Sequence, residues 1–480
     1  MPIVRPSRTS VLTRRSFSAA TLAAVTHAQP RRPNFLVLFT DDQRFDTIRA
    51  LGNREVQTPN MDRLVRRGVS FTHAFTMSGT HGAVCVPSRA QLMTGLTLWH
   101  AHANFIAKPD DTRFERRPYR AFPAELRKAG WQTFATGKWH NGPKLFNECF
   151  ADGGNIFFGG MTDQNHAPVH PYDPGARYPK ESSRTLHEFS SAAFATTAMD
   201  FLRRRDRAKP FLLYVAFTSP HDPRTPPERF ARLYDPARVQ LPPNFQPEHP
   251  FDIGVRDIRD ELLAPYPRTP DVVRRHIADY YGMISEVDHN IGRILDALEA
   301  SGEADNTFIV FAGDNGLAVG RHGLFGKQNL YEHSLRVPLV ISGPGLPRGK
   351  RSLALCHIMD ICPTILDLAG VPIPREIESR SLGPVLRDPQ TRHRDAIVFG
   401  YANLQRGIRD ERWKLLEYNV AGKRTTQLFD LKNDPWEMNN LAAAASGQPR
   451  IASMRERLKR ELRAAGDIVD LDAAEWARMT

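Results

Sequence analysis

Residues 34–42 read NFLVLFTDD, and this stretch sets the fold class. Positions 34–39 form a continuous apolar run, so a strand built from them would be buried on both faces. Such strands are typical of a parallel sheet that carries helices on each side. Comparable runs occur at 211–217, 307–312 and 337–341. The sequence therefore predicts several buried parallel strands.

Helical patterns lie between these runs. Residues 271–300 carry apolar side chains at helical spacing, and Ser301-Gly302 ends the pattern. Strands that alternate with helices predict an α/β fold with a large, mostly parallel sheet sandwiched by helices. Residues 218–270 are rich in Pro and Arg and poorly periodic, so we expect long surface excursions near a site.

The C-terminal part has a different pattern. A polar linker at 387–394 precedes short strand-like pieces and one charged helix. These pieces are 396–399, 413–418 and 427–431, and the helix is 451–464. We therefore expect a main domain at 33–385 and a C-terminal subdomain at 386–480, formed by a smaller antiparallel sheet with a helix.

The N-terminus carries a targeting pattern. Adjacent arginines at 14 and 15, a short weakly apolar run and a small-residue site resemble a twin-arginine signal peptide at 1–28. A disordered basic tail is the alternative. No segment reaches about 18 uninterrupted apolar residues, so we expect no membrane span. The chain is expected to be exported to the periplasm or beyond the cell.

The formal net charge is +12, or +8 without residues 1–28, which hold four Arg and no acid. A mildly basic protein suits an anionic substrate. We find no nucleic-acid motif and no Lys/Arg block in the body of the chain, so no nucleic-acid partner is expected. The four cysteines form neither a zinc pattern nor a dense disulfide framework. Buried structural thiols are favoured for all except Cys85.

Cys85 begins the segment CVPSRAQLMTG, which ends at Gly95. From the residues alone this is a helix start, where an anion is favoured, or a buried thiol before a proline-initiated helix. The segment resembles the signature of type I sulfatases, Cys-x-Pro-Ser-Arg followed by Leu-x-Thr-Gly. In that family a separate formylglycine-generating enzyme oxidises the cysteine to formylglycine (3-oxoalanine). The hydrated aldehyde has two hydroxyls, one to attack sulfur and one to expel sulfate.

Oxygen ligands follow two of the apolar runs. Asp41, Asp42, Asp314 and Asn315 are hard donors that suit Ca²⁺ or Mg²⁺. Taken separately, the first pair suits a helix cap and the second an ordinary turn. Because the carboxyl ends of parallel strands meet at one edge of a sheet, these clusters could converge. The resemblance implies one calcium ion, with the oxidised Cys85 as a fifth ligand.

A second motif, TGKWH at 136–140, resembles the family's Gly-Lys-x-His signature. The resemblance implies that Lys138 binds sulfate oxygens and that His140 contacts the nucleophile and acts as a base. A surface lysine and a capping histidine at a strand end are the alternative. The spacing favours the functional interpretation.

Four further positions rest mainly on the resemblance. His221, in SPHDP, is the implied general acid, and Lys327, in HGLFGK, is the implied sulfate clamp. Arg89 would orient the formylglycine and offset charge. His322 is a candidate substrate-binding residue without an assigned role. A lone His or Lys is more often structural or solvated.

The resemblance runs from about residue 34 to 441 and implies an alkaline-phosphatase-like fold and sulfate ester hydrolysis. The expected substrate is a sulfated small molecule or a sulfated saccharide, and we favour the saccharide. Its recognition is expected in 100–120, 141–185 and 222–270, with aromatic and basic residues such as Trp99, His100 and His102. Two alternatives are a phosphomonoesterase or phosphodiesterase of the same superfamily and a non-catalytic binder of sulfated glycans.

Overall fold

The computed structural model describes residues 31–478. The expected export signal at 1–28 lies outside the described residues. The elements below all belong to the unit Arg32–Thr480. Among its described residues no helix is long and apolar enough to cross a membrane. Cys149, Cys356 and Cys362 are buried and free, as is Cys85.

The central sheet has eight strands in the order β13-β2-β12-β10-β1-β9-β5-β6. β1 is parallel to both β10 and β9, and β5 is parallel to β9 and β6. The strands are β1 (Asn34–Thr40), β2 (Gly68–Phe71), β5 (Gln132–Lys138), β6 (Asp152–Phe157), β9 (Phe211–Ala216), β10 (Thr307–Gly313), β12 (Leu339–Ser342) and β13 (Lys350–Ser352). The predicted α/β class with a mostly parallel sheet is confirmed.

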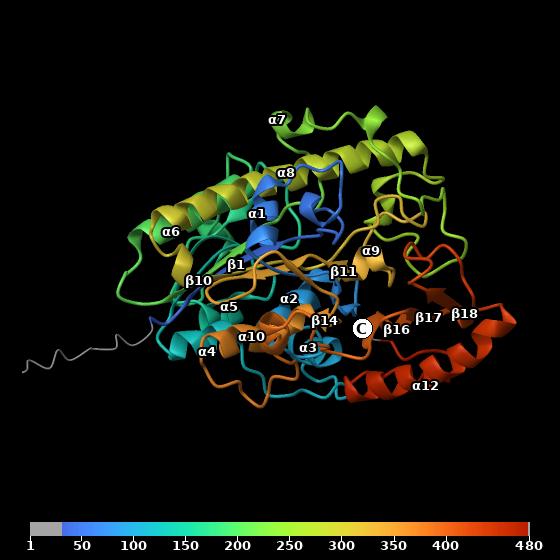
Figure 1. Cartoon of the computed structure of the whole chain (residues 1–480). Helices are drawn as coiled ribbons and strands as arrows, with labels where there is room; N and C mark the ends of the chain where they lie inside the picture. The colour runs from blue at the N-terminus through green and yellow to red at the C-terminus, as the bar shows by residue number, and fades with distance from the viewer. Residues whose placement is uncertain (1–30, 479–480) are drawn as a thin grey trace, which may run out of the picture. The chain divides into compact units, whose positions relative to one another are not determined.

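The apolar run of β1 is buried on both faces because helices cover each side of the sheet. Leu36 and Leu38 pack into a core with α1 (Pro59–Arg67), α6 (Ser190–Arg204) and α8 (Pro270–Ala300). Phe35, Val37 and Phe39 face the opposite core, with α4 (Phe122–Lys128) and α10 (Ile361–Leu368). Figure 1 shows α8 and α6 above the sheet and α4 and α10 below it.

The run at 337–341 does not form the parallel strand that its composition predicts. Pro338 lacks an N–H and divides the run into two strands of different sheets. β11 (Arg336–Val337) joins a small sheet with β3 (Ala74–Phe75) and β14 (Cys356–His357). β12 pairs antiparallel with β10, so the central sheet is mixed at this side.

The second sheet is formed mainly by the C-terminal part, as predicted. β15 (Ile397–Tyr401), β16 (Gln405–Arg409), β17 (Trp413–Val420) and β18 (Lys423–Asp430) are antiparallel, and α12 (Gln448–Ala464) packs against three of them. The short strand β4 (Ser78–Gly79) adds to β15 in parallel. The chain then enters α2 (Cys85–Thr94) within a few residues, so this sheet helps to place the start of α2.

The remaining elements are short. They are α3 (Leu98–Phe105), α5 (Pro143–Cys149), α7 (Glu228–Ala231), α9 (Glu332–Leu335), α11 (Gly383–Arg387), β7 (Pro168–Val169), β8 (Arg184–Thr185) and the 3₁₀ turns η1 (Arg49–Leu51), η2 (Lys180–Ser182), η3 (Pro236–Arg238), η4 (Glu261–Leu263), η5 (Ala304–Asn306), η6 (Ile358–Asp360) and η7 (Ala445–Gly447). The segment 218–270 contains only α7, η3, η4 and the first residue of α8, which agrees with its expected irregular course.

Candidate active site

Two neighbouring strand ends bring the predicted oxygen ligands together. Thr40 of β1 is paired with Gly313 of β10, so the residues that follow both strands share one edge. The backbone N–H of Asp42 donates to Asp314 Oδ1 at 3.0 Å. The ligand atoms of Asp41, Asp42, Asp314 and Cys85 all lie within 4.8 Å of one another, and all four residues are buried.

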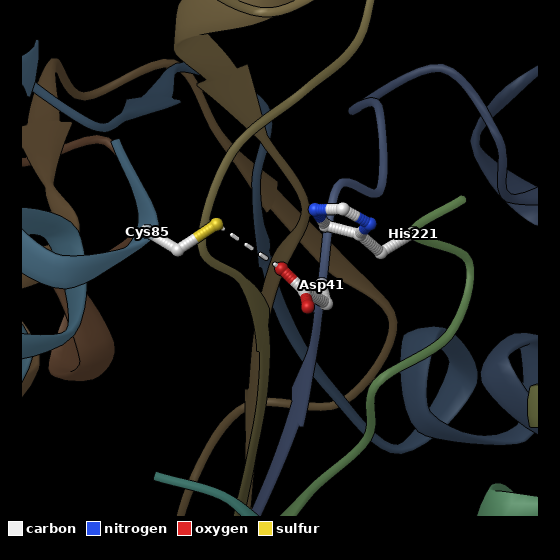
Figure 2. A group of neighbouring side chains, drawn as sticks. All are labelled: Asp41, Cys85 and His221. Carbon is white, nitrogen blue, oxygen red and sulfur yellow. Dashed lines mark hydrogen bonds between the residues drawn. The ribbon is translucent and has the colours of Figure 1, made fainter. Parts of the chain in front are cut away.

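Cys85 enters this cluster as the first residue of α2. Its side chain is 2% exposed, and its Sγ donates to Asp41 Oδ1 at 3.4 Å, as Figure 2 shows. Ser88 Oγ, one turn later, donates to the carbonyl oxygen of Asp314 at 2.7 Å and fixes the helix start to β10. The amide of Asn315 donates to Cys85 Sγ at 3.8 Å. The thiol therefore faces the acidic cluster, away from the apolar core.

The thiol is not activated as a nucleophile. Burial raises the pKa of Cys85 well above its ordinary value, and Asp314 and Asp41 raise it further. Nucleophilic cysteines need a lowered pKa, since the thiolate is the reactive form. The encoded thiol thus lies where a nucleophile is expected, but its raised pKa does not favour the reactive thiolate.

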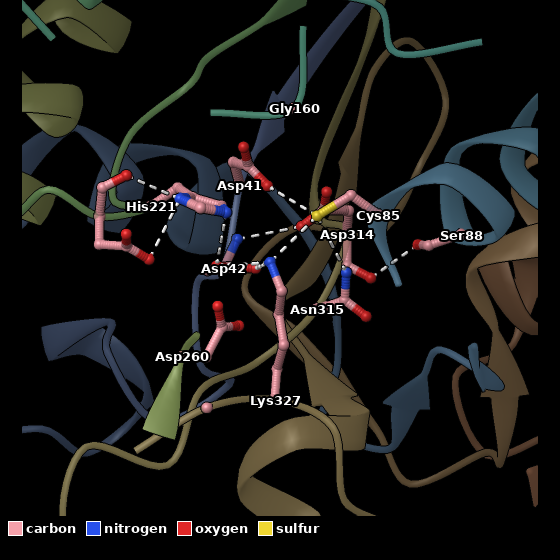
Figure 3. Close-up of polar contacts among 12 residues, drawn as sticks. Asp41, Asp42, Cys85, Ser88, Gly160, His221, Asp260, Asp314, Asn315 and Lys327 are labelled. Carbon is pink, nitrogen blue, oxygen red and sulfur yellow. Dashed lines mark hydrogen bonds and ion pairs between the residues drawn. The ribbon is translucent and has the colours of Figure 1, made fainter. Parts of the chain in front are cut away.

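Each carboxylate of the cluster meets a buried cation, and Figure 3 shows Lys327 beside Asp42. Lys138 Nζ lies 2.5 Å from Asp41 Oδ2 and donates to the Gly160 carbonyl at 2.6 Å. Lys327 Nζ lies 2.5 Å from Asp42 Oδ1 and 3.1 Å from Cys85 Sγ. These two amines therefore already lie where an anionic group beside Cys85 would bind.

Arg89 binds the third carboxylate of the cluster, that of Asp314. It is 1% exposed, its Nε donates to Asp314 Oδ2 at 3.2 Å, and its Nη1 donates to the Lys138 carbonyl at 2.8 Å. Burial raises the pKa of Asp314 to about 6, and the nearby Asp41 adds to the rise. A buried group of like charges is stabilised by a bound cation, and carboxylate and amide oxygens are the donors that Ca²⁺ takes. The cluster fits a divalent ion.

Two histidines flank the thiol. His221 Nδ1 donates to the backbone carbonyl of Asp222 at 2.8 Å, which leaves Nε2 3.6 Å from Asp42 Oδ2. Burial and the nearby Lys327 lower the pKa of His221 to about 4. Burial and the nearby Lys138 lower the pKa of His140 to about 3. Both imidazoles are neutral at pH 7 in this state.

A cavity of about 270 Å³ opens over the cluster, lined by Cys85, His140, His221 and Lys327. The sequence pattern did not single out the residues that complete its rim. They include Gly160, Met161, Ile258, Arg259, Asp260 and Gln328. Gly160 lies against the His140 ring, where a Cβ would come within 2.7 Å of Cε1. The Gly-Gly pair at 159–160 is therefore the one sequence feature that could have indicated a close approach of the backbone at this rim.

Arg259 lies at the rim of this cavity and pairs with two acids. It makes two ion pairs to Asp222 and one to Asp260, at 2.6 Å for the latter. Asp222 Oδ1 in turn lies 3.3 Å from His221 Nδ1. These contacts hold the His221 imidazole toward the cavity. They come from 222–270, a segment expected near the site.

Some predicted substrate residues lie elsewhere. His322 does not line this cavity; its ring stacks on Tyr331 at 4.0 Å, and its Nε2 lies 3.0 Å from Asn244 Nδ2. Trp99, His100 and His102 are buried in or against α3, with 1% exposure or less. Their polar and aromatic character favoured a binding role in the sequence. In the structure α3 packs against α2 and the C-terminal segment, away from the rim of the cavity.

The family profiles cover most of the chain. The sulfatase profile matches residues 33–371. The profile described as N-sulphoglucosamine sulphohydrolase, C-terminal, matches residues 320–465. The two matches together span the central sheet and the C-terminal sheet.

Curated relatives align along nearly their whole length. The N-acetylglucosamine-6-O-sulfatase of Bacteroides thetaiotaomicron is 27% identical over 90% of this chain and 86% of its own. The arylsulfatase of Clostridium perfringens is 28% identical, with 90% and 94% covered. The choline-sulfatase of Rhizobium meliloti is 28% identical, with 92% and 88% covered.

Solved structures share the fold. A protein in complex with its substrate D-glucosamine-2-N,6-O-disulfate has a TM-score of 0.75 at 24% identity, covering 91% of this chain and 98% of its own. The phosphonate monoester hydrolase of Agrobacterium radiobacter has a TM-score of 0.71 at 24% identity, covering 93% and 99%. The fold is therefore found with sulfur and with phosphorus ester chemistry.

Proposed function

The chain belongs to the sulfatase family and is a sulfuric ester hydrolase, and we propose that it acts through a formylglycine made from Cys85 beside one bound Ca²⁺. The observation that carries the proposal is the place of Cys85, buried among three carboxylates and beside the Lys327 amine. Oxidation by a formylglycine-generating enzyme would replace an inert thiol with oxygen donors at this place.

The cation would be held by Asp41, Asp42, Asp314 and Asn315, with the oxidised residue 85 completing the set. When present, the hydrated aldehyde supplies an oxygen nucleophile and a second hydroxyl for sulfate release, and the ion supplies positive charge to the sulfate oxygens. Mg²⁺ is the other hard cation that such a donor set accepts.

The lysines would bind and orient the sulfate. Lys138 reaches the cluster from the end of β5 and Lys327 from the loop between β10 and α9, and both are nearly fully buried. In a dry site an ammonium–sulfate contact is stronger than in water, so two of them position the sulfur beside residue 85. Arg89 fixes Asp314 and the Lys138 backbone and so keeps this geometry in place.

The histidines would move protons. His140 is neutral and lines the cavity, so it can accept a proton near residue 85. His221 must be protonated to serve as the acid for the leaving oxygen. A bound sulfate ester carries negative charge, which raises the pKa of a neighbouring imidazole. We therefore assign proton donation to His221 in the substrate complex, with Asp222 and Arg259 orienting it.

We propose a sulfated saccharide as the substrate class. Support comes from a relative named for N-acetylglucosamine-6-O-sulfate and from the related structure that holds a sulfated glucosamine. A screen of defined sulfated saccharides, with choline sulfate and an aryl sulfate alongside, tests this point. Faster turnover of choline sulfate or the aryl sulfate than of every saccharide would contradict it.

The reaction itself is tested by parallel kinetics on one aryl sulfate and the matching aryl phosphate. Matured wild-type enzyme should prefer the sulfate, and Cys85→Ala should lose turnover of it by at least a thousandfold. The residual rate of Cys85→Ala is the internal control for contaminating activity. A preference for the phosphate would favour the phosphomonoesterase or phosphodiesterase alternative, and near wild-type activity of the variant would end the formylglycine proposal.

We also propose export by a twin-arginine signal at 1–28, which rests on the sequence pattern alone. Replacing Arg14 and Arg15 by Lys preserves charge and removes the arginine pair. The variant should accumulate in the cytoplasm of its native host, whereas the unaltered chain should appear in the periplasm. Equal export of both would contradict the signal.

A further inference from the structure

A second cavity of about 580 Å³ lies behind the metal-ligand loop and shares no lining residue with the cavity over Cys85. Its floor includes Arg44, two residues beyond Asp42, together with Arg321 and His333. The Arg44 backbone N–H donates to the Tyr280 hydroxyl, which donates to the Asp42 carbonyl. Tyr280 therefore links the loop residue that lines the cavity to the loop residue of the acidic cluster.

Two buried arginines in the lining of this second cavity share one carboxylate. Arg44 and Arg321 are nearly fully buried, and both pair with the single carboxylate of Asp46. Buried charges are normally paired, so the shared carboxylate leaves this pair of arginines with one positive charge that an anion can match.

Several buried polar atoms at the same floor have no partner among the described residues. They are Arg44 Nη1, Arg321 Nε, Asn244 Oδ1 and both ring nitrogens of His333. All four residues line the cavity and are at least nine-tenths buried. Asn244 Oδ1 is an acceptor, and a neutral imidazole has one donor and one acceptor nitrogen, so the donors here are the two guanidinium groups and one ring N–H of His333. Buried donors in native proteins normally have partners, so these unpartnered groups indicate a ligand site.

The walls are apolar and aromatic. Phe45 lies under the Arg336 guanidinium at 4.0 Å, and Trp436 lies against Arg321 at 5.0 Å. Leu51, Leu241 and Ile277 add to the apolar lining, and Leu241 is half-buried. A charged floor beneath aromatic walls matches a ligand with an anionic head and an apolar ring.

We propose that this cavity is a second binding site for a small organic anion, a carboxylate or sulfate carried on an apolar ring. The anionic group lies against Arg44, Arg321 and His333, and the ring packs between Phe45 and Trp436. The site is separate from the proposed reaction and does not depend on formylglycine or the metal ion.

The test uses 2-naphthoate and its neutral analogue 2-naphthalenemethanol in calorimetric titrations of the full chain. Naphthoate should bind one per chain, at least tenfold more tightly than the alcohol. Inorganic sulfate at a concentration that saturates the Cys85 cavity should not displace it. Equal binding of the two probes, displacement by sulfate, or no saturable naphthoate binding up to millimolar concentration would overturn the site.

Three variants locate the binding. Arg321→Met removes the surplus cation and leaves the Arg44–Asp46 pair, so naphthoate binding should weaken at least tenfold. Leu241→Trp fills part of the cavity and should do the same without changing charge, which keeps the test open if Arg321→Met fails to fold. Arg66→Met, the same change at an exposed position outside the cavity, is the control. Wild-type affinity in both folded cavity variants would contradict the proposal.

Discussion

Asp42 has a backbone conformation that an aspartate seldom adopts. Its φ is 65°, in the left-handed region, two residues after the end of β1 at Thr40. Its N–H donates to Asp314 and its carbonyl accepts from Tyr280, so the surrounding contacts fix this strained turn. The turn lets two successive side chains reach the same cluster, although successive residues of a continuing strand would point to opposite faces.

The leaving-group role of His221 is testable with two substrates. In His221→Ala, hydrolysis of an alkyl or sugar sulfate should fall by about a hundredfold or more, because a general acid contributes on the order of 10²–10⁴. Hydrolysis of a nitrophenyl sulfate, whose leaving group needs no proton, should fall less than tenfold. His289→Ala, at an exposed histidine of α8, should change neither rate. Equal losses on both substrates would exclude proton donation.

At the residue scale, the sequence motifs located the cluster because they mark residues that must lie at strand ends and helix starts. Asp41, Asp42 and Asp314 follow buried strands, and Cys85 begins a helix, so parallel pairing brings them together. His322 shows the limit of this reasoning. A histidine in a polar motif is equally suited to stacking, and only the tertiary packing against Tyr331 decides between the two.

The helix α8 contains a buried acid that makes stability depend on pH. Burial raises the pKa of Glu286 to about 8, while the side chain accepts from Asn290. Below about pH 4.5 Glu286 is protonated in both the folded and the unfolded protein. Between about pH 4.5 and about pH 8 it is protonated when folded and ionised when unfolded, so unfolding releases a proton. The free energy of unfolding therefore falls by up to about 1.4 kcal/mol for each unit by which the pH rises.

Glu286→Gln removes this titration. The melting temperature of the variant should rise relative to wild type as the pH increases from 5 to 8. Asp296→Asn, on the exposed side of the same helix, serves as the control and should show no such trend. Parallel pH profiles of wild type and Glu286→Gln would show that Glu286 is ionised in the folded protein.

The strand β5 needs a glycine directly before Lys138. Gly137 has φ of 94°, and a Cβ there would come within 1.9 Å of the Ala216 carbonyl oxygen of β9. The register between β5 and β6 also shifts at this point. Gly137→Ala should therefore cost roughly 1–3 kcal/mol of stability and displace Lys138.

The matched control is Gly142→Ala, which has φ of 75° and no heavy atom within 4 Å of its Cβ position. This change should cost only the left-handed strain of about 1 kcal/mol. Denaturant unfolding and the KM for a sulfate ester separate the two effects. An unchanged KM in folded Gly137→Ala would show that Lys138 does not depend on this backbone approach.

At the element scale, periodicity predicted α8 and the buried strands because their apolar patterns are long. The pattern at 337–341 misled because composition does not reveal strand direction. Pro338 is visible in the sequence, but its effect depends on which neighbouring strands pair with the residues on either side of it. Here β10 and β3 take different halves of the run.

The whole molecule couples its two main sheets close to the active site. β4 extends the C-terminal sheet and precedes α2, while Lys414 of β17 is buried against Glu332 of α9 and Glu437. The order of the strands along this sheet could not be read from the sequence, because β4 has only two residues and no pattern of its own. The boundary expected at residue 385/386 stays a prediction.

Metal removal should destabilise the entire fold. The proposed ligands follow β1 and β10 at the centre of the main sheet, so an ion that binds only the folded state would stabilise it by about 4 kcal/mol at a thousandfold excess over Kd. Chelation should lower the melting temperature of the matured protein, and Ca²⁺ should restore it. Asp314→Asn, which removes one ligand charge, should respond much less. A melting temperature independent of Ca²⁺ in the wild type would contradict the metal assignment.

The central claim is that residue 85 acts as formylglycine, and mass spectrometry of the active protein from its native host tests it most directly. The account predicts that the tryptic peptide containing Cys85 is lighter than encoded and reacts with a hydrazide, in proportion to the sulfatase activity of each preparation. Full activity in a preparation whose Cys85 peptide has the encoded mass and an intact thiol would contradict the account.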